Sequence, residues 1–124
     1  AEACNELGET REALDKLEMV RARARRTVHP ADMTVGLPEI TETGKEKLRE
    51  IIWNERRIEL ALEGHRFFDL IRADKVVPGY AEKMMKAHGK TNFSIAKHAT
   101  FFIPQKQVDI SQGVLKISSP GPFS

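Results

Sequence analysis

The sequence has little of the features that mark specialised classes of protein. It holds one cysteine in 124 residues, Cys4, so an internal disulfide and a cysteine-rich zinc site are both excluded. No apolar run approaches the roughly 20 residues of a membrane-spanning helix. The N-terminus has neither the basic start nor the apolar stretch of a signal peptide. Because the chain starts within a helical pattern and without methionine, we expect a fragment or a processed piece of a longer protein.

Charge of one sign is also scarce. Lysine and arginine together number 20, and aspartate and glutamate 18, which gives a net charge of +2. A nucleic-acid-binding protein usually carries a larger and clustered positive excess, so we expect no nucleic-acid partner. The chain is 31% charged and 40% hydrophobic, a balance that argues against intrinsic disorder.

The apolar residues that are present recur at helical spacing. Residues 1–26 predict a helical hairpin that turns at Gly8, because glycine readily ends a helix in a left-handed conformation. The apolar stripe of the second helix consists of Ala13, Leu17, Val20 and Ala24. This hairpin has the pattern of half a tetratricopeptide repeat. Residues 27–43 hold two prolines and a glycine and predict a loop.

The next helix is predicted over residues 44–63, opened by a capping box of Thr43 and Glu46. One arc of its helical wheel carries Leu48, Ile51, Ile52, Ile58 and Leu62 together with Glu55 and Glu59. The opposite side carries Trp53 and Leu60. A helix with apolar residues on two sides is expected to be covered on both, so we expect this helix at the centre of the fold.

Shorter helices are predicted over residues 65–72 and 80–89, followed by an irregular segment to the end of the chain. Pro104 follows an extended apolar stretch, and proline is excluded from central strands. The predicted fold class is therefore all-α, with tetratricopeptide-like helical hairpins and a long irregular C-terminal segment.

Sequence spacings that mark common catalytic sites are missing. The chain has no Gly-rich phosphate loop, no H-E-x-x-H, no Glu-x-x-His pair and no G-x-S-x-G. Cys4 as a nucleophile would need a histidine brought to it by the fold, and a small core thiol is the plainer interpretation. We therefore expect no catalytic, cofactor-binding or metal-binding residues, and a protein that is not an enzyme.

Glu55, Glu59 and Glu63 lie one helical turn apart and allow two interpretations. Paired carboxylates perform acid–base chemistry or bind a hard cation. On an apolar arc they instead indicate a structural ion network, because a buried charge must be paired. We expect Glu55 and Glu59 to be buried against arginine, with the candidates Arg21, Arg23, Arg25, Arg66 and Arg72. The predicted network comprises Glu55, Arg56, Glu59, Glu63, Arg66 and Asp69.

Residues 48–72, LREIIWNERRIELALEGHRFFDLIR, closely resemble the C-terminal signature of the SusD/RagB family of nutrient-uptake lipoproteins of Bacteroidetes. Residues 12–24 are similar to the helix that closes the family's last tetratricopeptide-like unit. Residues 102–109 are similar to a block near the family's C-terminus, although Phe102 stands where the family has proline. The resemblance covers nearly all of this chain and only the last part of a family member.

The resemblance implies how the chain is organised and where it works. Residues 1–26 end a tetratricopeptide-like hairpin, 27–43 form a loop, and 44–124 form the SusD/RagB-type C-terminal helical segment. All three belong to one fragment of a larger domain. The parent protein is implied to be lipid-anchored at the cell surface of the outer membrane, with this segment itself soluble.

The resemblance also implies carbohydrate binding for nutrient uptake and polysaccharide utilisation, with a TonB-dependent, SusC-like transporter as partner and no cofactor. The family's ligand contacts lie mostly in loops outside the signature. We therefore expect the oligosaccharide to be bound mainly by other parts of the parent protein, and the resemblance assigns no ligand-binding residue here. The alternative is a tetratricopeptide-type protein–protein scaffold that binds no ligand directly.

Overall fold

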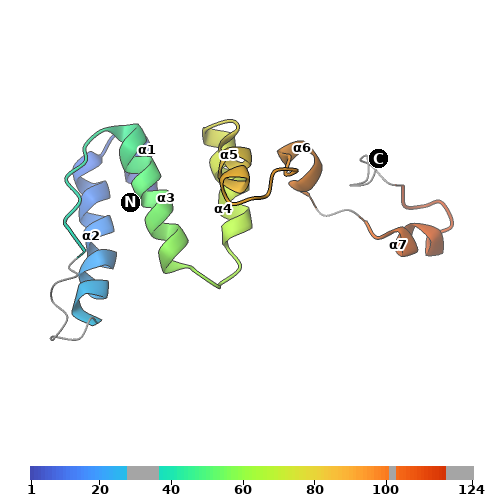
Figure 1. The fold of residues 1–124 in the computed structure, drawn as a ribbon, viewed down its shortest axis with the longest axis horizontal. Coiled ribbons are helices and arrows are strands. Elements are labelled where there is room, and N and C mark those ends of the chain that lie inside the picture. The colour runs from blue at the N-terminus through green and yellow to red at the C-terminus, as the bar shows by residue number, and fades with distance from the viewer. Residues whose placement is uncertain (28–36, 101–102, 117–124) are drawn as a thin grey trace. The chain divides into compact units, whose positions relative to one another are not determined.

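The computed structural model describes residues 1–27, 37–100 and 103–116. It divides into two compact units, a first unit of residues 1–62 and a second unit of residues 63–124. All regular structure in the described ranges is helical (Figure 1), which confirms the all-α class.

The described residues form seven helices, which the two units share. The first unit contains α1 (Glu2–Leu7), α2 (Thr10–Thr27) and α3 (Lys45–Glu59). The second contains α4 (Arg66–Val76), α5 (Tyr80–Ala87), α6 (Ile95–His98) and α7 (Gln105–Ile110). Helices α4 and α5 correspond to the two short helices predicted after Gly64, although α4 continues past residue 72.

The predicted N-terminal hairpin is confirmed, and Gly8 makes its turn. Gly8 adopts φ 84°, a left-handed conformation that costs other residues energy and glycine very little. Its N–H donates to the carbonyl of Asn5 at 3.1 Å, and the N–H of Glu9 donates to the carbonyl of Cys4 at 2.8 Å. These bonds satisfy the last carbonyls of α1 and reverse the chain into α2.

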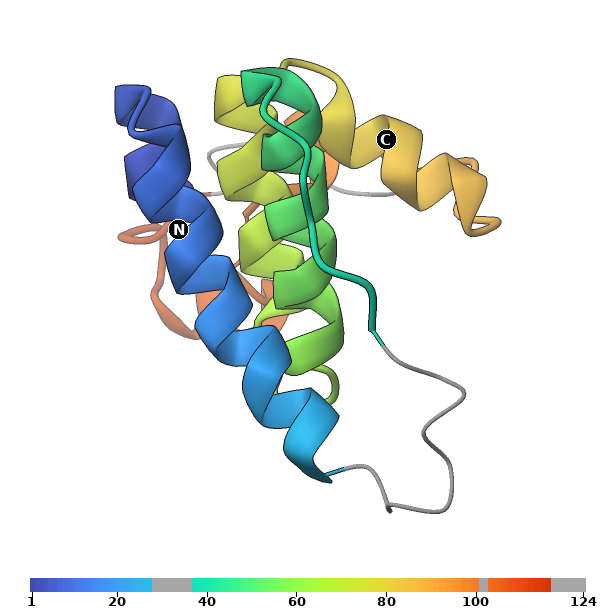
Figure 2. The same cartoon turned by 90° about the vertical axis from the view of Figure 1, so that its left-hand side faces the viewer.

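The core of the first unit lies between α2 and α3. Its fully buried members are Ala13 and Leu17 of α2 with Leu48 and Ile52 of α3. The two helices run side by side in Figure 2, and the extended segment 37–44 returns from the end of α2 to the start of α3. Helix α3 is buried on two sides. Leu48 and Ile52 face the core, and Trp53, on the opposite side of the helix, is also buried, with 5% exposure. This is the central position that we expected for α3.

Both ends of α3 differ from the prediction. The helix begins after Gly44 without a side-chain cap, and the Gly44 N–H donates instead to the Glu42 carboxylate at 2.8 Å, so the capping box of Thr43 is wrong. The helix ends at Glu59, because Leu62 adopts φ 69° and Gly64 φ 78°. Leu62, beyond the helix, and Ile58, in its last turn, are both exposed, and their assignment to a covered arc is wrong.

The second unit has a smaller core where α4 packs against α5. Leu70, Ala73 and Ala81 are buried there. The Ala81 N–H donates to the Asp74 carboxylate at 2.8 Å, which fastens the first turn of α5 to α4. Phe67 of α4 contacts Phe93 edge to face at 6.5 Å between ring centres.

Two predicted segments fall partly outside the described residues. The predicted loop 27–43 includes residues 28–36, and the extended stretch before Pro104 includes residues 101–102. The boundaries expected between hairpin, loop and C-terminal segment stay a prediction.

Truncation of Leu48 tests the packing of the first unit. Leu48 has 0% exposure, so Leu48→Ala should lower the free energy of unfolding by about 3 kcal/mol, through lost burial and a residual cavity. The control Ile58→Ala removes a side chain that is 58% exposed and should change stability by less than about 0.5 kcal/mol. Urea unfolding followed by circular dichroism measures both. Equal losses would contradict this core.

Candidate functional site

Arg21 and Glu55 form a buried ion pair between α2 and α3. Arg21 Nη1 lies 2.5 Å from Glu55 Oε2, and the two side chains are only 9% and 13% exposed. Arg21 Nη2 also donates to the carbonyl of Pro38 at 3.0 Å. One arginine therefore joins α2, α3 and the segment that precedes α3. Its Nε has no hydrogen-bond partner among the described residues.

Glu59 is paired as well, but near the surface. Its carboxylate contacts Arg23 of α2, and the two side chains are 35% and 63% exposed. The expectation that Glu59 is buried is therefore wrong, because α3 ends at this residue and nothing in the first unit covers it fully. Arg25 contacts Glu18 and donates to the carbonyl of Leu37 at 2.9 Å.

The other members of the predicted network lie in different surroundings. Arg56 is half-buried on α3. Glu63 lies in the turn after α3, 3.9 Å from His65. Asp69 lies 3.4 Å from Arg72 within α4, and Arg66 is half-buried at the start of that helix. A single network of all six residues stays a prediction.

Sequence reasoning missed a second set of contacts, between α1 and α3. Arg49 meets the Glu6 carboxylate with two bonds, Nε to Oε1 at 2.5 Å and Nη2 to Oε2 at 2.7 Å. Trp53 Nε1 donates to Glu2 Oε1 at 2.8 Å. The signal was present, because Glu2 and Glu6 are four residues apart, as are Arg49 and Trp53, and such pairs share a helix face.

The contact between Arg49 and Glu6 also changes the pKa of both side chains. The hydrogen bonds from Arg49 lower the pKa of Glu6, and the attraction of Lys45 adds to this effect against the opposing effect of burial. The same contact raises the pKa of Arg49. The carboxylate is therefore held ionised, which suits an anchoring role and not proton transfer.

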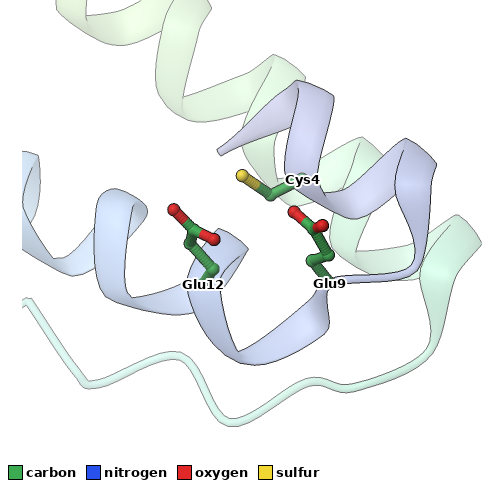
Figure 3. A group of neighbouring side chains, drawn as sticks. All are labelled: Cys4, Glu9 and Glu12. Carbon is green, nitrogen blue, oxygen red and sulfur yellow. The ribbon is translucent and has the colours of Figure 1, made fainter.

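Cys4, Glu9 and Glu12 come together where α1 meets α2 (Figure 3). Their possible ligand atoms all lie within 4.8 Å of one another. Both carboxylates are exposed, whereas Cys4 is half-buried and packs against the core. Acidic residues at the start of a helix are favoured by its dipole, which accounts for Glu9 and Glu12 without an ion. The expectation of no metal site stays a prediction.

A shallow pocket of about 330 Å³ lies in the second unit, beside the turn between α5 and α6. Its lining includes Met85, Lys90, Thr91, Asn92, Phe93 and His98. The rings of Phe93 and His98 stack with centres 5.4 Å apart and planes inclined by 24°. Sequence reasoning did not identify these residues as a site, because no local pattern links them.

Comparison with known proteins gives the family of the chain. The sequence profile of the SusD family matches residues 1–117. The chain belongs to the SusD family. The SusD-like protein P38 of Formosa agariphila is 37% identical over 78 residues, which is 62% of this chain and 15% of that protein. This chain therefore spans a small part of the length of that SusD relative.

Membership in the SusD family confirms the resemblance read from residues 48–72. No solved structure gives a significant match. Among the residues that the structure describes, no helix is both long enough and apolar enough to cross a membrane.

The two carboxylates of α3 differ in burial, and this difference is testable. Glu55→Ala should lower the free energy of unfolding by about 3 kcal/mol, because it leaves the buried Arg21 unpaired. The matched variant Glu59→Ala breaks an exposed pair and should cost less than about 1 kcal/mol. Urea unfolding compares the two variants, and replacing both buried partners, as Arg21→Met with Glu55→Leu, should recover most of the loss. A larger loss for Glu59→Ala would contradict this assignment.

The lowered pKa of Glu6 predicts a pH dependence of stability. Its contribution is fully present above the ordinary glutamate pKa of about 4.3 and is lost as the pH falls through the lower pKa of the folded state. Between neutral pH and about pH 3, the wild type should therefore lose more stability than Glu6→Gln. Urea unfolding at a series of pH values measures this. The control Glu50→Gln removes an exposed acid of α3 and should run parallel to the wild type. Parallel curves for Glu6→Gln would refute the anchoring role.

Proposed function

We propose that this chain is the C-terminal part of a cell-surface lipoprotein of the outer membrane that binds glycans and delivers them to a TonB-dependent, SusC-like transporter. The observation that carries the proposal is the SusD family match over residues 1–117. The protein captures its ligand without altering it, so it is not an enzyme and needs no cofactor.

The packing of the signature supports a scaffolding role for residues 48–72. Leu48, Ile52 and Trp53 of this stretch are buried, and Arg49 is bonded to Glu6. Side chains used in this way are not available to a ligand. The oligosaccharide is therefore bound mainly by other parts of the parent protein, with this segment as support.

A protein–protein scaffold is the second candidate, and the N-terminal hairpin favours it. Leu7 of α1 and Met19 of α2 are 76% and 67% exposed. Large exposed apolar side chains on a helical hairpin are suited to binding another helix. In this alternative the segment contacts a protein partner and no glycan.

Two measurements on the native protein that carries this chain distinguish the candidates. In gels that contain neutral or anionic polysaccharides, we expect at least one polysaccharide to retard the protein. After mild solubilisation of outer membranes, we expect a SusC-like transporter to co-purify with it and to be identified by mass spectrometry. Retardation by no polysaccharide, with the transporter still bound, would favour the scaffold. Release of sugar products would contradict the absence of catalysis.

A further inference from the structure

The second unit contains a stretch that is rich in positive charge and holds no acidic residue. Residues 83–100 contain four lysines and two histidines but no aspartate or glutamate, although the net charge of the whole chain is +2. The acid that immediately precedes them, Glu82, is already engaged. Its carboxylate accepts the N–H of Ile95 at 3.0 Å and lies 3.5 Å from Lys86 Nζ. This stretch therefore offers cationic side chains with little internal neutralisation.

The pocket beside the α5–α6 turn lies within this cationic stretch. The stacked rings of Phe93 and His98 give it an apolar wall, and Lys90, Thr91 and Asn92 are exposed polar residues around it. An apolar or aromatic surface with a few convergent polar groups is the usual composition of a small-molecule site. The volume of about 330 Å³ falls at the lower end of the range for such sites.

Backbone hydrogen bonds fix the turn that carries these residues. The Lys90 N–H donates to the carbonyl of Met85 at 2.9 Å, and Gly89 takes the left-handed conformation, φ 80°, that this bond requires. At the other end of the turn, the backbone N–H of His98 donates to the carbonyl of Ser94 at 2.9 Å. The His98 Nδ1 lies 2.9 Å from the same oxygen and 3.1 Å from the Ser94 nitrogen. A turn held at both ends loses little conformational entropy when a ligand binds.

We propose that this pocket binds the anionic group of an acidic glycan, a uronate carboxylate or a sulfate ester. The ammonium of Lys90 attracts the anion, Thr91 and Asn92 offer hydrogen bonds to the sugar hydroxyls, and the Phe93–His98 pair contacts the apolar face of the ring. The inference rests on the proposed function and deepens it, because it names the chemical class of the glycan and a contact on this segment.

The experiment follows backbone amide resonances of the full chain during titration with three probes. These are methyl β-D-glucuronide, galactose 6-sulfate and the neutral methyl β-D-glucoside. The acidic probes should shift the amides of residues 89–98, and the neutral probe should not. Tighter binding of methyl β-D-glucuronide would indicate that the pocket prefers a carboxylate, and tighter binding of galactose 6-sulfate that it prefers a sulfate ester. Added salt should weaken the binding, because the charges are exposed to solvent.

Matched variants tie the shifts to the pocket. Lys90→Gln and Asn92→Ala should each weaken the acidic probe roughly three- to tenfold, as expected for the loss of one polar contact. Lys75→Gln and Asn54→Ala, which change exposed residues elsewhere, should leave the affinity unchanged. Both pocket variants alter exposed side chains, so the fold should persist, and the unchanged amide spectrum of residues 1–62 checks this.

The outcomes separate this inference from the proposed function. If polysaccharides retard the native protein but residues 89–98 do not respond to the acidic probes, the pocket assignment is overturned and the proposed function stands. Equal shifts with the neutral probe would also overturn it. If the acidic probes bind at residues 89–98 but no polysaccharide retards the native protein, the pocket stands and the proposed function fails.

Discussion

Helix α3 needs cover on two sides, and the rest of the first unit depends on how that cover is attached. Apolar side chains of α2 cover one side and build the core. The other side is covered by α1, which at six residues is too short to persist alone in water. It is held because Glu6 bonds Arg49 and Glu2 bonds Trp53. Apolar packing adds to these polar contacts, because Ala1 and Cys4 at α1 also pack against the core.

Helical spacing was enough to predict the hairpin, α3, α4 and α5, because hydrophobic period is a local property of the sequence. Helices α6 and α7, with four and six residues, lie in the segment expected to be irregular, because a helix so short shows no repeated period. The same spacing contained the partner of Glu55. Arg21 continues the four-residue spacing of Ala13 and Leu17, both of which are buried. Arg25 continues the same spacing, so the spacing narrows the candidates to these two arginines, and in the structure Arg21 is the buried one, at 7% exposure.

The helical wheel wrongly predicted that Ile58 and Leu62 are buried, because it assumes that every apolar arc of a helix is covered. Nothing in the local pattern distinguishes Leu62 from Leu48, yet the first is fully exposed in a left-handed conformation and the second is fully buried. The pocket of the second unit was out of reach for a related reason. Its geometry depends on contacts across the sequence, such as that of Glu82 with Ile95 and that of Phe67 with Phe93.

The signature, residues 48–72, and the pocket proposed above occupy different parts of the stretch that the SusD profile matches. Arg49 and Trp53 belong to the signature and are committed to packing and to fixed bonds with α1, so a change there alters stability before it alters binding. The cationic stretch 83–100 lies outside the signature and carries several exposed polar side chains. Its side chains take no part in the core of the first unit, which Ala13, Leu17, Leu48 and Ile52 form. Packing therefore constrains the signature more tightly than the exposed side chains of residues 83–100, where the proposed ligand contacts lie.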